Sequence, residues 1–177
     1  YTELSQAIKL SEIYNGSASK WDWGTIGNVR PSFDEYWAPY LKIIKYCETA
    51  DDCGYDNSNP WKRPNGAPAG LGAVFPLSRT TVVLANGSIL VVVSYAGQTG
   101  SLAKYIFVDT NGSKKPNQYG KDGFFFELEE GKGLMPYRYS VLTETEINNN
   151  CSKNGDGGYC SAKLMRDGWQ IKNDYPW

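Results

Sequence analysis

The chain contains no histidine among its 177 residues. Histidine is the commonest general base, the usual partner of a serine or cysteine nucleophile, and a leading zinc ligand. Its absence argues against most hydrolytic triads and against zinc enzymes. Catalysis by carboxylates, lysine or tyrosine remains as the alternative, and we expect a protein that is not an enzyme.

Long apolar runs are also lacking. The longest uninterrupted aliphatic stretch covers residues 89–93, whereas a membrane-spanning helix needs roughly 20 apolar residues. The sequence therefore predicts no spanning segment between its first and last residues. The chain begins at Tyr1 rather than at methionine, which favours the removal of an upstream signal or anchor.

Strong charge of either sign is missing as well. Eighteen basic and 19 acidic residues leave a net charge of -1, and the two adjacent basic pairs, at 62–63 and 114–115, are too sparse to follow a phosphate backbone. Nucleic acid is therefore not predicted as a partner. A hydrophobic content of 41%, with 14% aromatic residues, predicts a single folded domain over residues 1–177.

Four cysteines form two close pairs, Cys47 with Cys53 and Cys151 with Cys160, within stretches rich in Asp, Asn and Gly. Four cysteines allow three connectivities, and two small loops are the simplest of them. A zinc site is the rival interpretation, but the spacings are wider than those of structural zinc knuckles. Two disulfides indicate an oxidising, extracytoplasmic compartment.

The first half of the chain predicts helices followed by a long surface segment. Residues 1–14 place Leu4, Ala7, Ile8 and Ser11 on one helical row, and Asn15-Gly16 ends the helix. A second helix is expected from about residue 32 to residue 46, interrupted by a proline at position 39. Residues 47–76 have little periodicity and predict an excursion over the surface, held by the first cysteine pair.

The second half predicts strands. Two β-branched runs, 80–85 and 88–93, flank Asn86-Gly87, a dipeptide typical of a hairpin with a type I′ turn. Further strands are expected at 103–108, 123–128 and 137–142, and a short helix at 159–166. This order predicts an α+β fold in which helices pack on one face of an antiparallel sheet.

The loop between the strands at 103–108 and 123–128 is rich in oxygen donors. Asp109, Asn111, Asn117 and Asp122 could surround a hard cation such as calcium. The loop is not an EF-hand, because Gly120 occupies the position of the bidentate glutamate. The alternative is a turn whose Asx side chains bond their own backbone. Both interpretations stay open, and calcium is the one cofactor that the sequence suggests.

Two further groups of residues are of types that can carry chemistry. The carboxylate pairs 51–52, 127–129 and 144–146 are more simply explained as turn caps or solvated faces than as a glycosidase pair. Trp21, Trp23 and Trp61 fall in predicted loops, where they could pack in the core or contact a partner or a sugar. A calcium-dependent glycan- or surface-binding module is thus one alternative function, and a carboxylate-based hydrolase is another.

Several segments taken together resemble the pilin-like proteins of type IV pili and type II secretion pseudopili. The resemblance rests on the helix at 1–14, the segment from 39 to 47, the Asn86-Gly87 hairpin, the loop from 109 to 122 and the tail from 160 to 177. It implies that residues 1–14 are the C-terminal half of a longer N-terminal helix, packed on an antiparallel sheet. It also implies that the loop from Cys151 to Cys160 is the counterpart of the pilin disulfide loop.

The same resemblance implies a function. The chain is expected to be a non-catalytic structural subunit of an extracytoplasmic filament, a type IV pilus or a secretion pseudopilus. Its partners would be other pilin or pseudopilin subunits, reached through an apolar helix upstream of Tyr1. That helix would also anchor the subunit in the membrane before assembly. Some pseudopilins hold calcium in a C-terminal loop, which favours the cation interpretation of residues 109–122.

Overall fold

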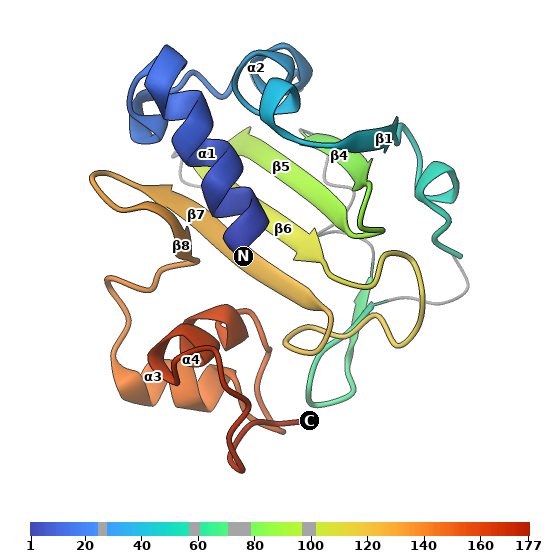
Figure 1. Ribbon diagram of the computed structural model, residues 1–177. Coiled ribbons are helices and arrows are strands. Elements are labelled where there is room, and N and C mark those ends of the chain that lie inside the picture. Colours follow the sequence, from blue (N-terminus) through green and yellow to red (C-terminus); the bar gives the residue numbers. More distant parts are fainter. Residues whose placement is uncertain (25–27, 57–60, 71–78, 97–101) are drawn as a thin grey trace.

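A computed structural model describes residues 1–24, 28–56, 61–70, 79–96 and 102–177. It has a mixed α+β architecture built on a six-stranded antiparallel sheet of order β1-β4-β5-β6-β7-β8, with a small β2-β3 pair beside it (Figure 1). The helices are α1 (Thr2–Asn15), α2 (Arg30–Tyr36), α3 (Glu144–Asn150) and α4 (Cys160–Arg166). The strands are β1 (Ile43–Tyr46), β2 (Trp61–Lys62), β3 (Pro68–Gly70), β4 (Arg79–Leu84), β5 (Ile89–Ala96), β6 (Leu102–Asp109), β7 (Gly123–Glu129) and β8 (Gly133–Pro136). The α+β class and the antiparallel sheet are confirmed.

The first helix lies across one face of the sheet (Figure 1). Its buried side chains are Leu4, Ala7, Ile8 and Ser11, which are the row that the sequence periodicity predicts. Gly16 ends the helix with a φ of 70°, a backbone conformation that L side chains rarely adopt. The solvent side of α1 retains large apolar side chains, so this helix is apolar on more than the face that the sheet covers.

The central hairpin of β4 and β5 forms where the sequence predicts it, but its turn differs. Of the two residues Asn86 and Gly87, only Gly87 has a positive φ, at 85°. Gly87 N–H donates to Leu84 O, and Leu84 N–H donates to Ser88 O. This is a three-residue loop with glycine in the left-handed position, so the type I′ prediction is wrong. The β-branched runs predict the two strands correctly. The Asn86-Gly87 dipeptide alone does not determine how many residues the loop contains.

Both faces of the sheet are buried. The face toward α1 and α2 carries side chains such as Leu90 and Ile106, and the opposite face carries Val91 and Phe107. The second face is covered by residues 47–56 and 61–70, and Trp61 among them is fully buried. This arrangement explains the continuous apolar run in β5, because a strand buried on both sides needs no polar alternation.

The fit between Trp61 and the sheet is close. A Cβ atom on Gly123 would lie 2.4 Å from the Trp61 ring and 2.7 Å from the Phe107 ring, so only glycine leaves room for the indole there. The Trp61 and Phe107 ring centroids are 5.2 Å apart, in an edge-to-face arrangement. Residues 47–56 and 61–70 therefore form a packed layer of the core rather than a loose surface excursion; the rest of the predicted excursion over 47–76 lies outside the described residues.

Two local predictions are wrong, and one helix was not predicted. Residues 43–46 form the edge strand β1 paired with β4, instead of continuing a helix past Pro39. The last strand is Gly133–Pro136, and residues 137–141 form turns. Helix α3 is not among the elements that the sequence predicts, although Thr143 and Glu146 form a reciprocal capping box at its start. That Thr-x-x-Glu spacing was visible in the sequence.

The outer strand β8 is fastened to the first residue of the chain. Tyr1 Oη donates a hydrogen bond of 3.0 Å to Leu134 O. Tyr137 N–H donates to Phe125 O. In an antiparallel pair, residues that bond the neighbouring strand alternate with residues whose backbone groups point away from it. The backbone groups of Leu134 and Pro136 therefore point away from β7. The Tyr1 ring also lies 4.5 Å, centroid to centroid, from the ring of Trp169.

Both predicted disulfides are present. Cys47 bonds Cys53, and Cys151 bonds Cys160, so the two-loop connectivity is confirmed and no free cysteine remains. The two bridges fit an extracellular or otherwise oxidising compartment. Across the described ranges, no helix is long and apolar enough to cross a membrane.

Candidate functional site

The loop that joins β6 to β7, residues 110–122, lies where several separate parts of the chain meet. Lys62 of β2 donates its N–H to Asn117 O and accepts from Tyr119 N–H. From the other end of the chain, Tyr175 Oη donates to Gly120 O at 2.5 Å. The loop is therefore held by the excursion that covers the sheet and by the C-terminal tail.

Asp109 is the most buried carboxylate of this loop region, with 0% of its surface exposed. Its Oδ2 accepts a hydrogen bond of 2.6 Å from Tyr55 Oη, and its Oδ1 accepts one of 3.2 Å from Asn111 N–H. Burial raises the pKa of Asp109 to about 7, against the opposing effect of the Tyr55 bond; the charge of Asp122 raises it further. Burial also raises the pKa of Tyr55, so its hydroxyl stays protonated and donates.

Asp122 is the second buried carboxylate, 3% exposed. It accepts hydrogen bonds of 2.8 Å from Asn117 N–H and 2.6 Å from Gln118 N–H. Burial raises the pKa of Asp122, while these backbone bonds and the side chain of Asn111 lower it. Two buried carboxylates that feel each other's charge are costly to ionise together, so this loop must hold either a proton or a compensating positive charge.

Two amide oxygens complete the donor set. Asn111 Oδ1 and Asn117 Oδ1 are shielded from solvent and have no hydrogen-bond partner within the part of the chain that the structure describes. Asn117 is 2% exposed. Unpartnered buried oxygens cost about 1–3 kcal/mol each, and a bound cation is one means of satisfying them.

The donor chemistry fits a hard cation. Carboxylate and amide oxygens are what calcium prefers, and each carboxylate oxygen that accepts one hydrogen bond keeps a second lone pair. The loop supplies two carboxylates, and no group of three or more Cys, Asp or Glu side chains with metal-ligand placement occurs among the described residues. The site would therefore depend on Asn111 and Asn117 as well as on Asp109 and Asp122.

The sequence predicted these four residues but missed Tyr55. Its hydroxyl reaches Asp109 from 54 positions earlier in the chain, and no local pattern marks that contact. The residue follows the first disulfide by two positions, and the burial of its ring, 2% exposed, is what carries the hydroxyl to the carboxylate.

The three tryptophans, for which both core packing and surface contact were open, are buried. Trp21, Trp23 and Trp61 are 4%, 5% and 0% exposed. Trp21 stacks on Tyr36 with ring centroids 5.1 Å apart, and its Nε1 donates to Gly16 O. These rings pack the loops onto the core, so they offer no face to a sugar or a partner, and a binding module built on them is contradicted.

The carboxylate pairs serve the local structure. Asp52 accepts hydrogen bonds from the N–H groups of Glu48 and Thr49, which makes it a turn cap. Glu127 accepts from Arg138 N–H, and Glu129 accepts from Lys132 and Ser140. Glu146 belongs to the capping box of α3. Each pair therefore has at least one member in a structural bond.

The fold and this loop define a disulfide-stapled α+β domain with a buried acidic loop beside its sheet. The chain belongs to a family of unknown function, DUF6613, whose model matches residues 1–177. No curated protein and no solved structure matches the chain.

Proposed function

We propose that this chain is the globular part of a non-catalytic structural subunit of an extracytoplasmic type IV pilus or type II secretion pseudopilus. Its partners are other subunits of the filament, and the contacts run through α1 and an apolar helical segment upstream of Tyr1. That segment would anchor the subunit in the membrane before assembly. The resemblance of the sequence and the placement of α1 across an antiparallel sheet support this proposal.

The observation that carries the proposal is the solvent side of α1. Leu10, Ile13 and Tyr14 are 51%, 72% and 78% exposed, although the opposite row of the same helix is buried against the sheet. A surface helix of a monomer normally presents polar side chains to solvent. Large apolar side chains on that side suit a helix that packs among neighbouring helices.

An Ile13→Asp substitution should block assembly without unfolding the domain. Most of the Ile13 side chain lies outside the core, so we expect its replacement to change the free energy of unfolding by less than about 1 kcal/mol. A charge on the packing side of the helix should prevent filament formation or secretion in the organism that carries the gene. Electron microscopy of surface filaments and a secretion assay are the measurements.

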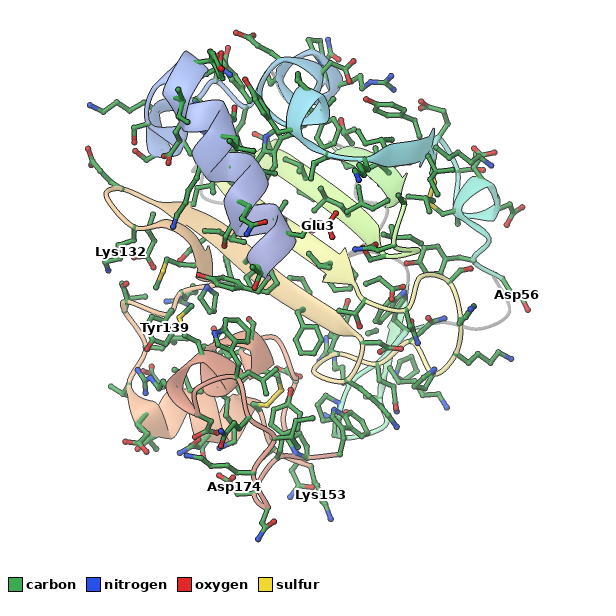
Figure 2. The ribbon with its side chains drawn as sticks, in the orientation of Figure 1. Glu3, Asp56, Lys132, Tyr139, Lys153 and Asp174 are labelled. Atoms are coloured by element: carbon green, nitrogen blue, oxygen red, sulfur yellow. A yellow bond between two sulfur atoms is a disulfide. The ribbon has the colours of Figure 1, made fainter. Side chains whose placement is uncertain are left out.

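Lys153→Asp is the matched control, because Lys153 is also exposed but lies near the C-terminal disulfide, away from α1 (Figure 2). It should leave filaments unchanged. Equal effects of the two substitutions, or a gene that encodes no apolar segment before Tyr1, would contradict the filament proposal.

A second proposed property is calcium binding in the β6–β7 loop. The unpartnered oxygens of Asn111 and Asn117 beside two buried carboxylates favour it. Such a cation would neutralise Asp109 and Asp122 and fix the loop between the covering segment and the C-terminal tail. Its role would be structural, as expected for a subunit that works outside the cytoplasm.

Calorimetric titration with calcium tests this property. We expect a dissociation constant on the order of 10⁻⁴ to 10⁻³ M, the range of extracellular calcium modules. Asp122→Asn should weaken binding at least tenfold, whereas Glu130→Gln, which changes an exposed carboxylate just after β7, should leave it unchanged. Absence of binding heat at millimolar calcium would contradict the cation site and favour the alternative, a turn whose Asx side chains bond their own backbone.

A further inference from the structure

A groove of about 510 Å³ runs between α1 and the turn that joins β7 to β8. One wall is formed by residues of α1 that lie beside its buried row. These residues are Thr2, Ser5, Gln6, Lys9 and Glu12. These positions share one side of a helix because they are separated by three or four residues. The other wall is Gly131–Leu134 with Lys132 on the turn (Figure 2). The volume falls within the range of small-ligand sites.

Some polar groups of the groove already make hydrogen bonds within the protein, and others do not. Lys132 Nζ is bonded to Glu129 and Ser140, and Glu12 Oε1 accepts from Ala18 N–H at 2.8 Å. The structure gives Gln6 and Lys9 no side-chain partner among the described residues. Their amide and ammonium groups are therefore free to bind a ligand.

Ser5 adds a hydroxyl that loses nothing by turning toward a ligand. Its Oγ is shielded from solvent and makes no hydrogen bond within the described residues. Rotation about χ1 into the groove therefore breaks no existing bond. Thr2 and Ser17 supply further hydroxyls along the same groove, so the lining offers donors and acceptors together rather than charges of one sign.

Apolar surface is present beside these groups. Tyr1, which is 45% exposed as a residue and has its ring 4.5 Å from that of Trp169, centroid to centroid, stands at one end. Leu134 lies in the opposite wall but is only 3% exposed, so Tyr1 contributes most of this apolar surface. A ligand with hydroxyl groups around its edge and an apolar C–H face matches both features. An anion fits less well, because the carboxylate of Glu12 shares the groove with Lys9.

We propose that this groove binds a neutral sugar, one or two pyranose rings in size, with Lys9, Gln6 and Ser5 as hydrogen-bonding residues and Tyr1 as the apolar platform. The site is separate from the β6–β7 loop and from the buried tryptophans. It does not depend on the filament proposal, since the groove is formed within the domain itself.

Nuclear magnetic resonance titration with maltose and with N,N′-diacetylchitobiose tests the proposal. Backbone amide shifts should move in residues 2–12 and 131–134, with a dissociation constant on the order of 1 mM for at least one of the two sugars. Sorbitol, which carries hydroxyl groups but no ring face, should produce no such shifts. Absence of localised shifts up to about 10 mM of either sugar, or equal shifts with sorbitol, would overturn the proposal.

Two tryptophan substitutions of equal bulk separate blocking of the groove from damage to the helix. Lys9→Trp places the ring in the groove, and Leu10→Trp places it on another side of the same helix, at a position that is 51% exposed. We expect roughly tenfold weaker sugar binding for Lys9→Trp and no change for Leu10→Trp. Equal affinities for both variants would contradict the assignment. Thermal unfolding of each variant shows that the comparison concerns folded protein.

Discussion

The Asp109→Asn variant is expected to be more stable than the native protein at about pH 8 and about equally stable at about pH 5, in calcium-free buffer. Burial raises the pKa of Asp109 to about 7, whereas an unfolded chain has an aspartate pKa of about 3.9. Between these values the folded protein keeps a proton that the unfolded chain loses. Native stability should therefore fall as the pH rises from about 4 to about 7 and level off above that.

The magnitude follows from the same linkage. One pKa unit corresponds to about 1.36 kcal/mol, so the change between about pH 5 and about pH 7 approaches 2–3 kcal/mol for this carboxyl group. Asparagine is nearly isosteric with the protonated acid and remains neutral, so the variant should lose most of this dependence. Urea unfolding at a series of pH values measures both curves.

The absence of histidine makes this measurement unusually direct. No side chain with an unperturbed pKa near neutrality competes with Asp109. The α-amino group of Tyr1 titrates in or near the window, but both proteins carry it, so the difference between them excludes it. Carboxyl groups whose pKa is lowered, such as that of Asp174, act only at lower pH. Burial raises the pKa of Asp122 and of Glu127 as well, but both proteins carry these two groups. Parallel curves for the two proteins would refute a buried, proton-holding Asp109.

Calcium should reverse the trend. A bound cation favours the ionised carboxylates, so the native protein in millimolar calcium should gain stability as the pH rises from about 5 to about 8. Asp109→Asn should remove that gain. If the pH dependence of stability is the same with and without calcium, the loop binds no calcium, and a proton alone neutralises its buried carboxylate.

The second large effect is expected at Trp61. Trp61→Ala should lower the free energy of unfolding by about 3–5 kcal/mol, because it empties a fully buried space between Tyr55, Phe107 and Tyr119. The covering residues, 47–56 and 61–70, would lose a large aromatic contact with the sheet. Chemical denaturation monitored by circular dichroism measures the change.

Trp169→Ala is the control for this substitution. Trp169 is 42% exposed and stacks only at the surface on Tyr1, so its loss should cost less than about 1 kcal/mol. Similar losses for the two tryptophans would mean that Trp61 is not the centre of a core layer.

The sequence predicted elements whose signals are local. The apolar row of α1 and the β-branched runs of β4 and β5 are patterns within one element, and the structure confirms them. Strand β1 was missed because its place is set by pairing with β4, which lies more than 30 residues away. Core packing was one of the two roles open for Trp61, but its position against the sheet could not be predicted, since that position depends on how the loop folds over the sheet.

The loop between β6 and β7 has some features that follow from local sequence patterns and others that depend on long-range contacts. Asp109 and Asp122 flank one loop, so their proximity followed from the hairpin expected around them. Their burial depended on Tyr55 and on the C-terminal tail, which approach from distant parts of the chain. Sequence patterns thus located the oxygen donors, while the pKa of Asp109 could be inferred only from the packed structure.

The fastening of β8 by Tyr1 has a consequence for how copies of this protein can meet. An exposed sheet edge with free backbone groups recruits strands from other molecules and so promotes aggregation. Along β8, the Leu134 carbonyl is already occupied by Tyr1 Oη, and Pro136 has no N–H to offer. This edge is therefore a poor template for a strand from another molecule. At this edge, ordered contacts between copies are left to side-chain surfaces, and concentrated solutions should resist fibrillar growth from this side of the sheet.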